Sequence, residues 1–303
     1  MAEERKRLTV PDLKARKKAK ERVVMASVPD FPSAVWADRA GIDVAAVGDS
    51  LGMTNYGYPN TLPVTVDMMV QHAQAVRRGA PNCMVLVAMP YGSYATADIG
   101  VLNALRLMKE GGADVVKMQG GQEKAPIIKA IADAGVPVMS HVGMCPHFMH
   151  LYGGFKLQGK TAVEAERILD DALAIEQAGA CGFEIEAVPA PVAKAVDDAV
   201  EIFSFGIGAG PASCGQLLLG YDLLGVFDQF KPKFTKRYAE LSKVAVEALK
   251  AYAADVRAGT FPDAEHSYSM KAEEAEMFRE LVEKRRNDLM AHRSAGTVTT
   301  VAP

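Results

Sequence analysis

The chain has 303 residues, 49% of them hydrophobic and 23% charged, and its 34 basic and 37 acidic residues give a formal net charge of −3. That length allows one large domain or two ordinary ones, with a sizeable core. The balanced charge excludes the basic footprint of a nucleic-acid-binding protein, and no stretch approaches the roughly 20 apolar residues of a membrane span.

The N-terminal sequence lacks the apolar core of a secretory signal. The four cysteines are far apart and form no CxxC pair; they are Cys83, Cys145, Cys181 and Cys214. Such spacing is typical of reduced thiols rather than of a disulfide framework or a zinc site. We therefore expect a cytoplasmic protein.

Short apolar runs alternate with longer amphipathic stretches between residue 23 and about residue 228. Several runs are apolar throughout and rich in β-branched residues, as are parallel strands buried on both faces. The predicted strands are residues 23–28, 44–48, 84–89, 114–118, 137–141, 182–187, 201–207 and 223–227. Helices are predicted between them at residues 66–78, 99–110, 125–134, 162–178 and 191–199.

Eight strand–helix alternations predict an α/β fold, a closed (β/α)8 TIM barrel, with a doubly wound open sheet as the alternative. Two further helices are predicted at residues 237–257 and 271–286. We therefore divide the chain into an N-terminal helical segment (residues 1–22), the barrel (residues 23–258) and a C-terminal helical extension (residues 259–303).

In such a barrel the chemistry lies at the C-terminal ends of the strands. The polar residues at or just after the predicted strand ends are Asp49, Ser50, Lys117, Gln119, His141, Glu184 and Glu186. Because side chains alternate along a strand, Lys117 and Gln119 share one face, and so do Glu184 and Glu186. An ammonium, an imidazole and carboxylates at one mouth suit an anionic substrate and proton transfer next to a carbonyl.

These residues also have structural interpretations. The turn at Asp49 can be a helix cap, and a histidine at a strand end is as often structural as catalytic. Glu186 is harder to explain in this way, because a buried carboxylate without a partner is costly. The glycine-rich residues 206–211 weakly resemble a phosphate-binding loop, and His147 and His150 have the spacing of a metal pair, but structural roles are the simpler interpretation for both.

Seven segments, in order along the chain, resemble the ketopantoate hydroxymethyltransferase family. They are residues 47–53, 61–65, 89–94, 135–143, 153–159, 206–211 and 232–238. The resemblance implies a barrel of the phosphoenolpyruvate/pyruvate superfamily that assembles into a homodecamer. It also implies transfer of a hydroxymethyl group from 5,10-methylenetetrahydrofolate to 3-methyl-2-oxobutanoate, which gives 2-dehydropantoate for pantothenate and coenzyme A biosynthesis.

The same resemblance implies roles for individual residues. In the family, Mg²⁺ chelates the 2-oxo acid and a glutamate removes its C3 proton. By position, Glu186 resembles the base, Asp49 the metal-ligating aspartate at the substrate, Ser50 the substrate-binding serine, Lys117 the substrate-binding lysine and His141 the active-site histidine.

Three positions depart from the family pattern. Ala88 replaces an aspartate of the metal environment, Gln119 replaces a glutamate, and His147 replaces a glutamine in the loop after the fifth strand. Asp49 alone would hold Mg²⁺ weakly, with Gln119 offering an amide oxygen. Our hypothesis is that Lys117 and His141 carry more of the enolate's charge, and that His147 serves as a substitute ligand or as a second acid–base group.

These departures leave an alternative function open. A paralogue with Ala88 and Gln119 would instead catalyse a folate-independent aldol, retro-aldol or lyase reaction on a different 2-oxo acid. A non-catalytic protein that binds a 2-oxo acid is a third possibility, which the retained ionisable residues disfavour. The expected partners are a 2-oxo acid, a folate and further copies of the chain, and neither nucleic acid nor a membrane.

Overall fold

Eight short parallel strands close into a barrel in sequence order, in a computed structural model that describes residues 5–295. The strands are β1 (Val23–Ser27), β2 (Val44–Val47), β3 (Met84–Ala88), β4 (Val115–Lys117), β5 (Val138–Gly143), β6 (Gly182–Glu186), β7 (Phe203–Ile207) and β8 (Gly215–Leu219). Pairing of β1 with β8 closes the barrel. The predicted (β/α)8 fold is therefore confirmed. Residues 1–4 and 296–303 of the predicted terminal segments lie outside the described residues.

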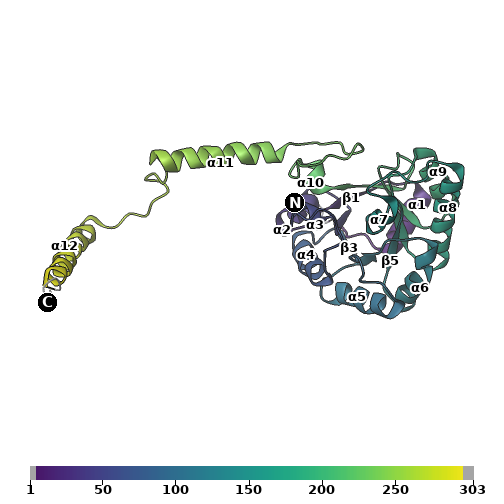
Figure 1. Cartoon of the computed structure of the whole chain (residues 1–303), viewed down its shortest axis with the longest axis horizontal. Helices are drawn as coiled ribbons and strands as arrows, with labels where there is room; N and C mark the ends of the chain where they lie inside the picture. Colours follow the sequence, from purple (N-terminus) through teal and green to yellow (C-terminus); the bar gives the residue numbers. More distant parts are fainter. Residues whose placement is uncertain (1–4, 296–303) are drawn as a thin grey trace, which may run out of the picture. The chain divides into compact units, whose positions relative to one another are not determined.

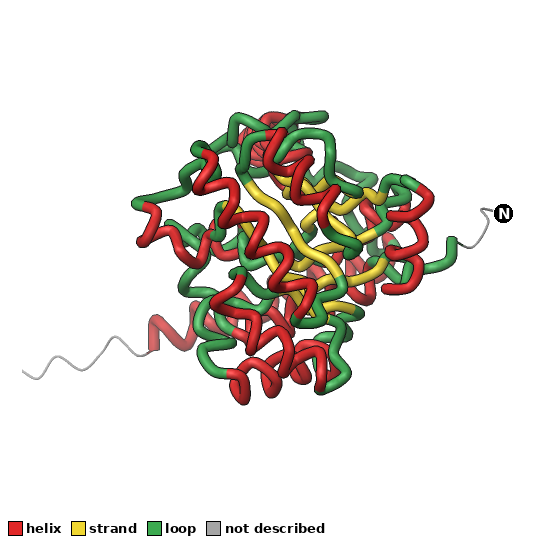
Figure 2. Tube along the Cα trace, turned by 90° about the vertical axis from the view of Figure 1, so that its right-hand side faces the viewer, coloured by secondary structure: helices red, strands yellow, loops and turns green. Residues whose placement is uncertain are grey.

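Helices surround the strands, as Figures 1 and 2 show. They are α2 (Phe31–Arg39), α3 (Leu51–Thr54), α4 (Val66–Gly79), α5 (Ala97–Lys109), α6 (Ala125–Asp133), α7 (Met149–Tyr152), α8 (Ala162–Gln177), α9 (Ala190–Ala199) and α10 (Gly220–Leu223), with single turns at Gln122–Lys124 and Pro146–Phe148. Threonine caps begin several of them. Thr65 accepts the Met68 N–H at the start of α4, and Thr161 accepts the Glu164 N–H at the start of α8.

Strand side chains alternate between two cores. Phe203 belongs to the cluster inside the barrel, whereas Val116 belongs to the cluster between strands and helices. Near the C-terminal ends of β4, β5 and β6 the inward positions become polar, and they are Lys117, His141 and Glu184. The two-residue period of a strand thus delivers ionisable side chains to the mouth of the barrel.

The other end of the barrel is closed by the N-terminal helix, α1 (Val10–Ala19). Its Leu13 is completely buried in the inner cluster, together with Val23 at the start of β1 and Phe203 at the start of β7. The helix ends at Lys20, which adopts a left-handed conformation. This segment therefore forms part of the barrel core.

The eighth strand is not where we predicted it. The predicted strand at residues 223–227 begins at the last residue of α10, Leu223, and β8 is the preceding apolar run, Gly215–Leu219. Glycine is required at the start of β8, because a Cβ on Gly215 would lie 2.6 Å from the carbonyl oxygen of Val23 on β1. Two similar apolar runs stand next to each other in the sequence, and only pairing with β1 distinguishes them.

The chain divides into two compact units, Met1–Ser242 and Lys243–Pro303. The division falls before nearly all of α11 (Leu241–Ala258), earlier than the boundary after residue 258 that we expected. The second unit also contains α12 (Ala272–Ala295), so both predicted C-terminal helices are present. No side chain of α11 is buried.

Candidate active site

Four ionisable side chains from β4, β5 and β6 meet inside the C-terminal mouth of the barrel. Lys117 Nζ lies 3.1 Å from Glu184 Oε2, and His141 Nδ1 lies 3.3 Å from the same oxygen. His141 Nε2 lies 3.2 Å from Glu186 Oε2 without forming a hydrogen bond. Strand register explains the meeting, because His141 is opposite Glu184 in the β5–β6 pairing. The imidazole therefore stands between two glutamates.

Burial sets the protonation of this cluster. It raises the pKa of Glu186 to about 8, against the opposing charge of Lys117. Burial and the charge of Lys117 together lower the pKa of His141 to about 3. Burial alone would lower the pKa of Lys117, but the negative charges of Glu184 and Asp49 outweigh the effect of burial and raise the pKa of the ammonium. The mouth thus combines a permanent cation, a neutral imidazole and a carboxyl group that exchanges its proton near neutral pH.

A second buried network lies around Asp49, in the turn after β2. His147 Nε2 lies 2.6 Å from Asp49 Oδ2, and His147 Nδ1 lies 2.5 Å from the hydroxyl of Tyr94. The backbone N–H of His147 donates to Gln119 Oε1, and the backbone N–H of Gln119 donates to the Tyr94 hydroxyl. Burial opposes ionisation of Asp49, but the charge and hydrogen bond of His147 outweigh it and lower the pKa of Asp49 to about 2.

The residues around Asp49 do not fit a Mg²⁺ ion, which needs near-octahedral oxygen ligands. Ala88, opposite Lys117 in the β3–β4 pairing, has no ligand atom. The two predicted ligands, Asp49 and Gln119, both bind His147 instead. Among the described residues, no group of three or more His, Cys, Asp or Glu side chains could hold a metal ion.

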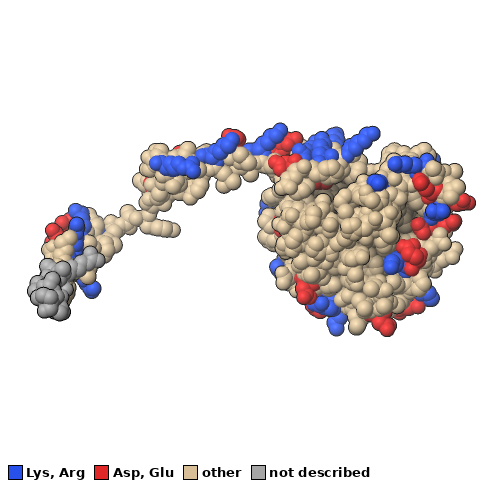
Figure 3. All heavy atoms as spheres, viewed as in Figure 1, with Lys and Arg blue, Asp and Glu red and all other residues tan. Residues whose placement is uncertain are grey.

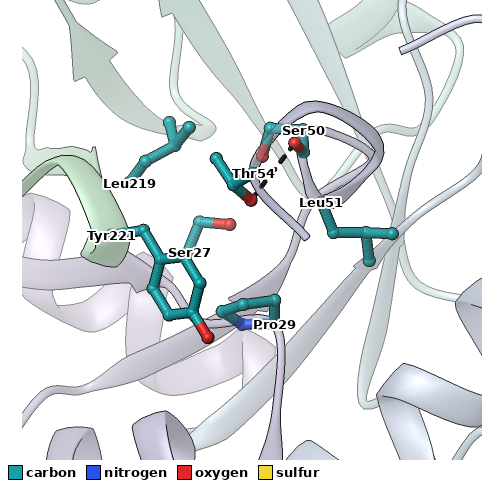
Figure 4. A pocket seen from close by; sticks show the side chains of 7 residues that line it. All are labelled: Ser27, Pro29, Ser50, Leu51, Thr54, Leu219 and Tyr221. Carbon is teal, nitrogen blue, oxygen red and sulfur yellow. Dashed lines mark hydrogen bonds between the residues drawn. The ribbon is translucent and has the colours of Figure 1, made fainter. Parts of the chain in front are cut away.

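A cavity of about 10 Å³ lies beside these networks, between the ends of β1 and β8 and the turn after β2 (Figure 4). It is lined by Ser27, Pro29, Ser50, Leu51, Thr54, Leu219 and Tyr221. The Thr54 hydroxyl donates to the carbonyl oxygen of Ser50, which fixes the turn. A space of this size holds a water molecule at most.

The structure brings together most of the residues predicted for the site. Lys117, His141 and Glu186 are in one cluster, and Asp49 and Gln119 are linked through His147. Ser50 lies at the adjacent cavity.

Two sets of contacts in the site, those of Glu184 and those of Tyr94, were not predicted. Glu184 was placed on the correct face by the strand alternation, but its pairing with both Lys117 and His141 was not anticipated. Tyr94 was not recognised as a partner of His147, because the two are far apart in the sequence. No sequence signal links the loops after β3 and β5.

The structure gives no support to two weaker sequence patterns. His147 is buried whereas His150 is exposed, so the two do not form a metal pair. Within the glycine-rich residues 206–211, Gly208 packs against the ring of Phe234, which lies so close that a Cβ on Gly208 would be 2.5 Å from it.

Charges on the barrel face seen in Figure 3 are of both signs and lie mainly around its edge, with a broad uncharged area between them. This distribution agrees with the balanced composition of 34 basic and 37 acidic residues. Among the described residues, no helix combines the length and apolarity that crossing a membrane requires.

Sequence comparison finds close relatives over most of the chain. The family model for ketopantoate hydroxymethyltransferase matches residues 7–264. The 3-methyl-2-oxobutanoate hydroxymethyltransferase 1 of Methylibium petroleiphilum is 55% identical over 284 residues, which are 94% of this chain and 97% of that protein. The 3-methyl-2-oxobutanoate hydroxymethyltransferase of a Thermus thermophilus strain is 48% identical over 262 residues, which are 86% of this chain and 100% of that protein.

Solved structures with a similar fold are more distant in sequence. A phosphonopyruvate hydrolase matches with a TM-score of 0.58 at 12% identity, covering 96% of this chain and 100% of that one. A 2,3-dimethylmalate lyase of the PEP mutase/isocitrate lyase superfamily matches with a TM-score of 0.56 at 14% identity, covering 94% of this chain and 99% of that one. At such low identity these matches establish the barrel fold alone.

Proposed function

Because this chain belongs to the ketopantoate hydroxymethyltransferase family, we propose that it transfers a hydroxymethyl group to 3-methyl-2-oxobutanoate, with 5,10-methylenetetrahydrofolate as the one-carbon donor. Glu186 removes the C3 proton, and the enolate carbon bonds to the one-carbon unit. Water supplies the hydroxyl oxygen and tetrahydrofolate leaves. The product is 2-dehydropantoate, a precursor of pantothenate.

The environment of Glu186 is the observation that carries this proposal. Its side chain is 13% exposed at the mouth of the barrel, and burial raises its pKa to about 8. A base with a pKa near the working pH balances the ionised fraction against proton affinity. A carboxylate of ordinary pKa would be a weaker base for a carbon acid.

Two neighbours support the chemistry of the enolate. Lys117 remains an ammonium and offers the charge that a carboxylate and a developing enolate oxygen need. His141 Nε2 is buried and has no hydrogen-bond partner among the described residues, which leaves that nitrogen for a substrate atom. Ser50, which lies in the turn after β2 and lines the adjacent cavity, would add a hydroxyl contact to the substrate.

The alternative, a folate-independent reaction on another 2-oxo acid, is not favoured by relatives that are 43–55% identical and named hydroxymethyltransferases. A product assay separates the two reactions. We expect 2-dehydropantoate from 3-methyl-2-oxobutanoate only when methylenetetrahydrofolate is present. Equal turnover without the folate, or cleavage of a different 2-oxo acid in its place, would favour the alternative.

We also propose that the chain self-associates. The helix α11 carries apolar side chains at Leu249, Tyr252 and Val256, which are 66%, 56% and 46% exposed. Their spacing places them on one face of the helix. Exposed apolar faces of this kind mark interaction surfaces, and a second copy of the chain is the expected partner.

A further inference from the structure

The buried contact between Asp49 and His147 has the geometry of a direct hydrogen bond. The 2.6 Å between Oδ2 and Nε2 is too short for two ligands of one Mg²⁺ ion, since ligand atoms at neighbouring octahedral positions are about 3 Å apart. Both side chains are nearly inaccessible, with 6% of Asp49 and 1% of His147 exposed. The imidazole therefore stands against the carboxylate oxygen that an ion would need.

Tyr94 fixes the imidazole from its other side. Burial raises the pKa of Tyr94 well above its ordinary value, so its hydroxyl keeps its proton. The hydroxyl accepts the Gln119 N–H and forms a hydrogen bond with His147 Nδ1, and the other ring nitrogen, Nε2, donates to the Asp49 carboxylate. Both ring nitrogens of His147 thus have a polar partner, and the ring of Tyr94 stacks on the imidazole at 5.9 Å between centroids.

Gln119 is the third residue of this arrangement. Its amide oxygen accepts the backbone N–H of His147, which ties the loop after β5 to the end of β4. A carboxylate at position 119 would accept the same N–H but would add a buried negative charge about the Asp49 network. The oxygens of Gln119 and Asp49 are thus both engaged by His147, and the side chain of Ala88 supplies no metal-ligating atom.

We propose that His147 is a positioning residue that takes the place of a divalent ion at Asp49, so that hydroxymethyl transfer by this chain is independent of metal. The inference rests on the proposed function for its reaction. In the arrangement we propose, the N–H donor of His147 holds Asp49, and the 2-oxo acid is bound by Lys117, His141 and Ser50.

Binding of Mn²⁺, followed by the electron paramagnetic resonance signal of the free ion, tests this inference without relying on turnover. We expect the full-length protein with 3-methyl-2-oxobutanoate to leave the free-ion signal unchanged. The triple variant Ala88→Asp, Gln119→Glu, His147→Gln supplies two carboxylates and removes the imidazole, and is expected to bind Mn²⁺. Stoichiometric binding by the unsubstituted protein would overturn the inference, even if the triple variant fails to fold.

Turnover with chelator distinguishes failure of the inference from failure of the proposed function. We expect formation of 2-dehydropantoate to be undiminished by EDTA and unaffected by added Mg²⁺. The single variant His147→Gln is expected to lose roughly 10–100-fold in kcat, as for other groups that orient a site residue, and not to recover with Mg²⁺. Loss of activity in EDTA with recovery in Mg²⁺ would overturn the inference. Absence of product under both conditions would overturn the function, and Mn²⁺ binding would still decide the inference.

Discussion

Glu186 titrates in the range where enzymes operate, and its pKa of about 8 leaves about a tenth of the carboxyl groups ionised at pH 7. Because the ionised form is the base, kcat/KM should rise with pH and level off above about pH 8. A pH profile of initial rates measures this. A rate that is flat between pH 6 and 9, or that falls as pH rises, would show that Glu186 is not the base in the free enzyme.

Substitutions in the buried pair of Lys117 and Glu184 should affect stability and activity differently. Lys117→Met leaves the Glu184 carboxylate buried without its ammonium, so we expect a loss of about 3–5 kcal/mol in the free energy of unfolding. The double variant Lys117→Met, Glu184→Gln should regain much of that loss, because the uncompensated charge is removed.

Turnover should remain low in both variants, because neither restores the cation at the mouth. Urea denaturation and steady-state rates on the same samples provide the comparison. Recovery of activity together with stability in the double variant would contradict a role for Lys117 in binding the substrate anion.

Prediction of individual site residues was most successful where strand alternation operates. Lys117, His141, Glu184 and Glu186 follow from strand ends and the two-residue period. The contact of His147 with Asp49 and Tyr94 depends on how three separate loops meet, and sequence spacing carries no information about that. The sequence did mark His147 as unusual, but not the partner that explains it.

Among the elements, the short helix α1 contributes to the stability of the barrel core. Leu13 is completely buried in the inner core at the start of the strands. Leu13→Ala should therefore cost about 2–5 kcal/mol in the free energy of unfolding. Leu102→Ala on α5 is the matched control, since Leu102 is 64% exposed and its truncation should change stability by only about 0.5 kcal/mol. Equal effects would mean that α1 is dispensable for the core.

The strand positions also show how much of the fold can be predicted from local sequence patterns. Seven of the eight predicted strands overlap strands of the structure, because apolar runs between amphipathic helices are distinctive. The eighth was displaced to residues 223–227, since the adjacent run at Gly215 is equally apolar and the pairing with β1 is non-local. The steric need for glycine at position 215 becomes visible only when Val23 and Phe205 are in place.

For the whole molecule, self-association should depend on the apolar face of α11. Leu249→Glu places a charge on that face and is expected to shift the population toward smaller species in sedimentation velocity experiments. Glu247→Gln is the control, because Glu247 is on the opposite side of the helix and pairs with Lys250. An identical mass distribution for the parent chain and both variants would contradict a role for this face of α11 in self-association.

The claim on which the function depends is that the barrel mouth removes the C3 proton of 3-methyl-2-oxobutanoate. Proton NMR in D2O, without folate or added metal, measures this step directly as loss of the C3 proton signal. We predict exchange with the unsubstituted protein and a rate lower by roughly 10²–10⁴-fold with Glu186→Gln, in line with loss of a general base. No exchange with the unsubstituted protein, or exchange at the same rate with Glu186→Gln, would contradict the account.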